Sequence, residues 1–208
     1  MLLVFGSINL DIAFRATHLP QAGETVLGGG YLVSPGGKGA NQAHAARRMG
    51  APVCLVGAVG RDAFAAPALE RLQDAGVDLS ALQRVDAPTG CAGIVVDAHG
   101  ENQIVVAPGA NQWLRASHVD DALLARARAV LVQQENEAHE IETLLVRARA
   151  AGVLTVLNNA PARAVGRDAL HCVDVLVVNA VELAATAQGA GLPAMADASA
   201  QVQAMSQA

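Results

Sequence analysis

The sequence predicts an α/β fold in which a mostly parallel β-sheet is flanked by helices. Short runs of apolar, often β-branched residues alternate along the chain with segments of helical pattern. Most of these runs are apolar at every position, which is typical of strands covered on both faces. Strands that follow one another through helices pair in parallel by right-handed crossovers. The 208 residues have room for one large domain or two small ones.

The individual elements follow from these patterns in chain order. The expected strands are LLVF (2–5), VCLVGAV (53–59), GIVVD (93–97), IVVA (104–107), AVLVQ (129–133), VLTVL (153–157) and VDVLVV (173–178). The expected helices lie at 40–49, 63–75, 119–127, 139–150 and 180–188. The tail, residues 193–208, is compatible with a helix but carries almost no apolar stripe.

Two stretches break the alternation of strands and helices. Residues 12–33 and 88–110 are rich in Gly and Pro and carry short apolar runs joined by turns such as DAHGEN, 97–102. This pattern favours a small β-flap added to the main sheet over another β-α-β unit.

Composition and charge exclude several classes of function. A net charge of −5, a pI near 5.6 and five aromatic residues favour neither a nucleic-acid backbone nor single-strand stacking. The three cysteines are isolated and the six histidines scattered, so we expect buried thiols and no metal site built on them. No apolar stretch reaches 18 residues and the N-terminus lacks the features of a signal peptide, so no membrane partner and a cytoplasmic location are expected.

The stretch SPGGKGANQ, 34–42, is the most informative part of the chain. Glycines 36, 37 and 39 directly precede a helix, whose unpaired N–H groups hold oxygen atoms or anions well. Lys38 stands among them as the only lysine, although a coding bias toward arginine would also explain a single lysine. The stretch fails as a Walker A loop, because Gly39 follows Lys38, and as GxGxxG, because Gln42 takes the last position. We therefore expect an oxygen-rich small molecule rather than a pyrophosphate here.

Polar residues follow the first strand in GSINLD, 6–11. Ligands bind at the carboxyl ends of strands in open α/β sheets, which is where Asn9 and Asp11 are expected. Asp11 can accept hydrogen bonds from two hydroxyl groups, and the amides of Asn9 and Asn41 can both donate and accept. The alternative is that Asn9 and Asp11 only end the strand and stabilise a turn.

These motifs, in this order and spacing, resemble those of the PfkB carbohydrate kinases, and within them the ribokinases. GSINLD, the segment 23–51 around GGKGAN, and VGAVGRDAFA (56–65) match the N-terminal region of that family. GENQIVVAPGAN (100–111), QQEN (133–136), NNAPAR (158–163) and VVNAVE (177–182) continue the match to about residue 185. The resemblance implies a ribokinase-like, Rossmann-like sheet in one domain over 1–208, with the flap segments as a β-lid that also forms a homodimer.

The resemblance also implies roles for individual residues. Asn9 and Asp11 would bind sugar hydroxyls, and Glu135 of QQEN would contact the sugar from the next strand end. The remaining residues of the same pocket would be Gly37, Lys38 and Asn41. Asn179 and Glu182 match the NxxE motif that serves the phosphates of ATP and the bound Mg²⁺.

The main departure from the family is that residues 1–208 contain no GAGD motif. That motif supplies the anion hole and the catalytic aspartate, so no catalytic residue is assigned, and the expected base lies beyond the C-terminus. The adenine pocket and a K⁺ site belong to the same part of the family. Asn159 and Val178 stand where proline is usual, which is tolerable.

We therefore expect the C-terminally truncated N-terminal part of an ATP-dependent kinase that converts D-ribose to ribose 5-phosphate, inactive by itself. Three alternatives remain open. The chain is a non-catalytic sugar-binding protein, a kinase for another furanose or a nucleoside, or a shortened product that does not fold stably because a sheet edge is exposed.

Overall fold

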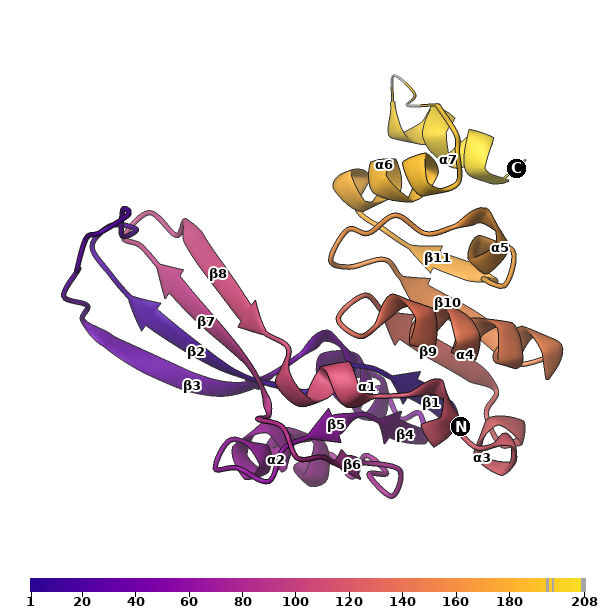
Figure 1. The fold of residues 1–208 in the computed structure, drawn as a ribbon, viewed down its shortest axis with the longest axis horizontal. Helices are drawn as coiled ribbons and strands as arrows, with labels where there is room; N and C mark the ends of the chain where they lie inside the picture. The colour runs from indigo at the N-terminus through magenta and orange to yellow at the C-terminus, as the bar shows by residue number, and fades with distance from the viewer. Residues whose placement is uncertain (194, 196, 207–208) are drawn as a thin grey trace.

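A computed structural model describes residues 1–193, 195 and 197–206. Its centre is a five-stranded sheet in the order β11-β10-β9-β1-β4, parallel throughout (Figure 1). The strands are β1 (Leu2–Phe5), β4 (Val53–Val56), β9 (Ala129–Gln133), β10 (Leu154–Asn158) and β11 (Val175–Val177). The expected α/β fold is thereby confirmed.

Helices cover both faces of this sheet. On one face, α1 (Lys38–Arg48) and α2 (Ala65–Asp74) pack against a buried cluster that includes Val4 and Leu55. On the other face, a second cluster contains Leu3 and Phe5 with α3 (Asp121–Ala125), α4 (Ala138–Ala150) and α5 (Arg167–Leu170). Successive residues of β1 thus enter opposite cores, which explains why the strand is apolar at every position.

A second sheet of four strands projects from the first (Figure 1). It has the order β3-β2-β7-β8, formed by β2 (Asn9–Arg15), β3 (Gly30–Gly36), β7 (Gly90–Val96) and β8 (Asn102–Ala107). The central pair, β2 and β7, is parallel, and each outer strand is antiparallel to its neighbour. Because β2 begins four residues after β1 ends, the root of this sheet lies at the carboxyl end of β1.

The other elements connect and flank these sheets. They are the two-stranded pair β5 (Ala58–Val59) and β6 (Gln83–Arg84), the 3-10 helices η1 (Gly109–Trp113) and η2 (Ala116–His118), and the helices α6 (Ala180–Gly189) and α7 (Ala198–Ser206). Within the expected tail, α7 packs on α6, while residues 194, 196, 207 and 208 lie outside the described residues. Among the described helices, none has both the length and the apolar character needed to cross a bilayer.

Several element predictions were wrong in extent, and two of them show the reason clearly. The run 53–59 forms two strands, because the chain leaves the edge of β1 at Gly57 and Ala58–Val59 pair with β6 instead. The helix expected at 119–127 contains only Asp121–Ala125, because the Asp120 carboxylate accepts from the Leu123 N–H at 2.6 Å and so sets the start. Val119 precedes that cap and is fully buried in the core.

Candidate functional site

The glycine-rich stretch places the start of α1 against the connection between β1 and β2. Helix α1 begins at Lys38, and Gly37 precedes it with φ = 89°. Only glycine adopts this conformation without strain, and a Cβ here would also lie 2.8 Å from the backbone nitrogen of Asn9. The first N–H groups of the helix are therefore held beside this connection, where the Glu135 carboxylate and Ser7 accept hydrogen bonds from them.

Asn9 and Asp11 lie on β2, so the alternative in which they only end the first strand and stabilise a turn is wrong. The first strand stops at Phe5, and the chain then enters the second sheet, where both residues point to the same face of β2. Asn9 is 3% exposed and Asp11 is partly buried. A Cβ at Gly36 would overlap the Asp11 carboxylate, so the glycine on β3 leaves the space that this carboxylate occupies.

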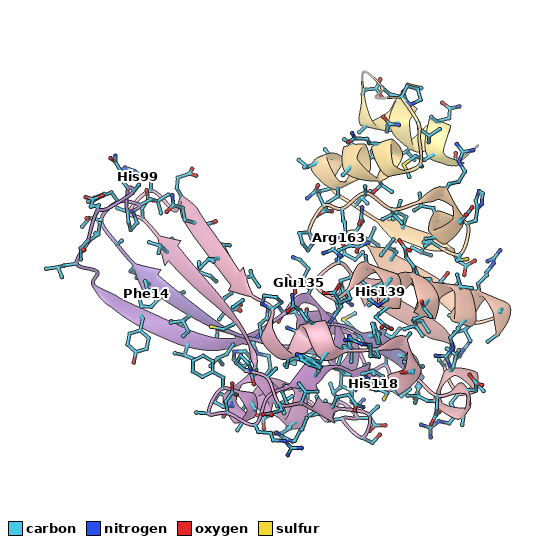
Figure 2. All side chains as sticks on the ribbon, viewed as in Figure 1. Phe14, His99, His118, Glu135, His139 and Arg163 are labelled. Atoms are coloured by element: carbon cyan, nitrogen blue, oxygen red, sulfur yellow. The ribbon has the colours of Figure 1, made fainter. Side chains whose placement is uncertain are left out.

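Glu135 follows β9 and reaches the start of α1. Its Oε2 accepts from the Ser7 hydroxyl at 2.6 Å and from the Lys38 backbone N–H at 3.0 Å. Its Oε1 lies 3.9 Å from the Lys38 ammonium. Ser7 Oγ in turn accepts from the Gly39 N–H at 3.2 Å. Figure 2 shows Glu135 between the two sheets.

The charges at this site are unevenly balanced. Partial burial and then the negative charge of Glu135 raise the pKa of Asp11, while the positive charge of Arg71 acts more weakly in the opposite direction. Glu135 faces the Lys38 ammonium and the positive end of α1, and the charge of Asp11 interacts with that of Glu135. This arrangement offers acceptors at Asp11 and Glu135 with donors at Asn9 and Lys38, which suits a small molecule carrying several hydroxyl groups.

The other three predicted residues are less tightly engaged. Asn41 lies in the first turn of α1, where its backbone N–H donates to Gly37 at 2.9 Å and its side chain is exposed. Asn179 and Glu182 start α6 and cap it reciprocally, since Asn179 Oδ1 accepts from Glu182 N at 2.9 Å and Glu182 Oε2 accepts from Asn179 N at 2.8 Å. The side chains of this pair are thus occupied by the helix start, with Glu182 Oε1 left over.

Two site residues were missed by the sequence analysis. Ser7 supports Glu135, and Asn111 of η1 donates to the side chain of Asn9 at 2.8 Å. Both stand in segments that carried the family resemblance, GSINLD and GENQIVVAPGAN, and that was their only signal.

Comparisons with known proteins identify the family. The family model described as "pfkB family carbohydrate kinase" matches residues 1–208. The ribokinase of Haemophilus influenzae is 35% identical over 184 residues, 87% of this chain. The chain spans only 60% of the length of that relative.

Solved structures agree in fold. A ribokinase from Giardia lamblia matches with a TM-score of 0.85 and 33% identity, over 99% of this chain and 65% of that one. An Arabidopsis thaliana ribokinase complexed with ribose and ATP matches with a TM-score of 0.85 and 30% identity, over 99% and 67%. The chain is therefore a member of the pfkB family of carbohydrate kinases, with a ribokinase-like fold.

Proposed function

We propose that this chain carries the sugar-binding part of a kinase that transfers the γ-phosphoryl group of ATP to D-ribose, giving ribose 5-phosphate. The observation that carries the proposal is the convergence of three distant segments, β2, the start of α1 and the residues after β9, on one group of donors and acceptors. The similar ribokinase whose structure holds ribose and ATP supports the choice of ligands.

In this proposal each converging residue has a task on the sugar. Asp11 and Glu135 accept hydrogen bonds from hydroxyl groups, and Asn9 and Lys38 donate to hydroxyl oxygens. Gly37 contributes its backbone to the pocket, since its missing side chain lets the start of α1 lie close to Asn9. Asn41 reaches the sugar from the first turn of α1. Held in this way, the sugar presents one hydroxyl for phosphorylation, which is the positioning that phosphoryl transfer requires.

The nucleotide and its Mg²⁺ are proposed for Asn179 and Glu182. Among the described residues, no group of three or more His, Cys, Asp or Glu side chains is arranged to hold a metal ion. A hydrated Mg²⁺ needs less, because it keeps several waters and binds through one or two carboxylates together with phosphate oxygens. The free Oε1 of Glu182 fits such a water-mediated contact. When bound, Mg²⁺ would neutralise charge on the phosphates.

We further propose that residues 1–208 do not transfer the phosphoryl group unaided, because they contain no GAGD motif to supply the base. K⁺ dependence stays a prediction without an assigned residue. The test is ADP release by the purified chain with ribose and MgATP. An Asp11→Ala, Lys38→Ala double variant is the control. Turnover above that control would contradict the proposal, and a coding frame that continues past Ala208 into a GAGD motif would support it.

Two alternatives share the same site. A non-catalytic sugar-binding protein would bind ribose without any turnover of ATP. A stop codon directly after the codon for Ala208 would favour this alternative. A kinase for another furanose or a nucleoside would bind those compounds more tightly than ribose. Competition between ribose and each of these compounds, measured by calorimetry, ranks the candidates. The proposed location is the cytoplasm.

A homodimer through the second sheet is part of the proposal. Large apolar side chains on this sheet are exposed, among them Tyr31 at 70% and Val105 at 72%. The ring centroids of Phe14 and Tyr31 lie 6.1 Å apart, and both residues line a hollow of about 620 Å³. Figure 2 shows Phe14 projecting from the sheet. Exposed apolar patches of this kind mark interaction surfaces.

Neighbouring residues of β8 point to opposite faces and therefore serve as a matched pair for the test. If one face of the sheet forms the dimer, only the variant on that face, either Ile104→Asp or Val105→Asp, will be monomeric in analytical ultracentrifugation. The variant on the other face will remain a dimer. A monomeric wild-type chain would contradict the dimer.

A further inference from the structure

We infer that Asn111 is a positioning residue that fixes the side-chain amide of Asn9 so that its NH₂ group, and not its carbonyl, faces the sugar. The inference rests on the proposed function, in which Asn9 binds a sugar hydroxyl. Asn111 lies on η1, 102 residues from Asn9 in sequence, and is 1% exposed.

The orientation of the Asn111 amide is set by the peptide groups of Ile8. Its Oδ1 accepts from the Ile8 backbone N–H at 2.9 Å, and its Nδ2 donates to the Ile8 carbonyl at 3.2 Å. If the oxygen and nitrogen of this amide were exchanged, its NH₂ group would face the Ile8 N–H and its oxygen would face the Ile8 carbonyl, and neither pair can form a hydrogen bond. The pairing with Ile8 therefore fixes which end of the amide is the donor.

That donor end also meets Asn9. Asn111 Nδ2 donates to Asn9 Oδ1 at 2.8 Å, so the carbonyl of Asn9 is engaged inside the protein. Within the described part of the chain, no hydrogen bond uses the Nδ2 group of Asn9. Its two N–H groups are the part of the side chain left for a ligand.

The contact between the Asn111 and Asn9 amides requires a glycine on the neighbouring strand. Gly90 on β7 stands opposite Asn9 on β2. A Cβ at position 90 would overlap both Asn111 Nδ2 and Asn9 Oδ1. The glycine thus leaves room for the pair of amides, in the same way that Gly36 leaves room for Asp11.

The consequence concerns which group of the sugar is recognised. Asn9 as fixed here can only donate, and Asp11 two residues further on can only accept when ionised. The ligand must then present an oxygen acceptor to Asn9 and an O–H donor to Asp11. Ribose hydroxyls do both, and a deoxy sugar lacking the hydroxyl beside Asn9 loses that contact.

The test measures ribose affinity by calorimetry for the wild type and for Asn111→Asp. Aspartate has no N–H to give to Ile8 or Asn9, so the Asn9 amide turns its carbonyl toward the sugar. We expect affinity to fall at least about tenfold. Asn159→Asp is the matched control, because Asn159 is another fully buried amide, bonded to Thr186 and to the Arg163 carbonyl.

Repeating the substitution in the Asn9→Ala variant separates a positioning role of Asn111 from a general loss of stability. If Asn111 acts through Asn9, adding Asn111→Asp to Asn9→Ala lowers the melting temperature again but leaves ribose affinity unchanged. An equal loss of affinity in both backgrounds would overturn the inference, as would wild-type affinity in Asn111→Asp. A folded wild type that binds no ribose would instead contradict the proposed function.

If Asn111→Asp does not fold, the wild type still decides the question by NMR. Ribose should shift the side-chain NH₂ signals of Asn9 far more than those of Asn111. Unchanged Asn9 signals at saturating ribose would overturn the inference.

Discussion

The Glu135 carboxylate accepts a hydrogen bond from the backbone N–H of Lys38 at 3.0 Å, across 97 residues of sequence. Helix α1 begins after Gly37, which has no side chain to cap it, so this carboxylate satisfies a helix-start donor in its place. The same carboxylate is proposed to contact the sugar. The start of α1 and the proposed sugar site therefore share this carboxylate.

Ser7→Ala tests the support of that carboxylate. The substitution leaves Glu135 without its 2.6 Å hydroxyl donor and leaves the buried Gly39 N–H without an acceptor. We expect a loss of about 1–3 kcal/mol in the free energy of unfolding, together with weaker ribose binding. Denaturant unfolding and calorimetry measure the two effects. Ser117→Ala, at an exposed position, is the control, and equal behaviour of the two variants would contradict the role of Ser7.

Glu135→Gln tests the coupling between the two carboxylates. The negative charge of Glu135 contributes to the raised pKa of Asp11, so removing it should lower the pKa of Asp11. Burial is the larger cause, and the pKa should therefore stay above its ordinary value of 3.8. Titration of the Asp11 carboxyl carbon by NMR in both proteins gives the answer. An unchanged or higher value in the variant would show that the two groups do not interact.

Asp11→Asn should stabilise the unliganded protein at neutral pH while abolishing ribose binding. Because the folded pKa is raised above 3.8, the folded state disfavours the charged carboxylate, and stability falls as pH rises through the folded pKa. The uncharged amide avoids this loss. Its advantage in melting temperature should be largest at pH 7 and should shrink as the pH falls toward 3.8. A variant less stable than wild type at pH 7 contradicts the assignment.

Gly36→Ala should displace Asp11 without introducing any polar or charged group. The added methyl would overlap the Asp11 carboxylate, whereas at Gly29 a Cβ meets nothing within 4 Å. We expect Gly36→Ala to weaken ribose binding at least about tenfold, the effect of losing one hydrogen bond to a charged group, and Gly29→Ala to leave it unchanged. Equal affinities in the two variants would show that Asp11 is not held as described.

Glu182→Gln separates capping of α6 from binding of the metal–nucleotide complex. Glutamine can still accept from the Asn179 N–H, so stability should stay within about 0.5 kcal/mol of wild type. The charge offered to Mg²⁺ is lost, and affinity for MgATP should fall roughly tenfold. Glu182→Ala should lose both. Wild-type MgATP affinity in the glutamine variant would reduce Glu182 to a structural residue.

Much of the main sheet could be predicted from sequence, because its strands β1 and β4 are buried on both faces and most of the runs are apolar. The edge strand β11 was found from its apolar residues although Val175 and Val177 are exposed. The residues at which helices and strands begin and end were harder to predict. Helix α1 starts at Lys38 rather than Ala40, since its cap comes from Glu135 and not from a neighbouring residue. The four residues of α5 carry too short a pattern to stand out, and the break at Gly57 reflects pairing with β6.

The site was partly predictable for a related reason. Asn9, Asp11, Lys38 and Glu135 were found through motifs, and the structure brings them together. Ser7 and Asn111 were missed, because a serine or asparagine that supports another side chain has no periodicity and no local partner in sequence. Their partners lie 128 and 102 residues away.

The most direct measurement is a calorimetric titration of D-ribose into the purified wild-type chain, with Asp11→Ala titrated in parallel. The account predicts saturable binding of one ribose per chain in the wild type and no measurable binding in the variant. A wild-type chain that unfolds cooperatively on heating, and so is folded, yet releases no heat of binding with ribose would contradict the central claim that these residues form a sugar site.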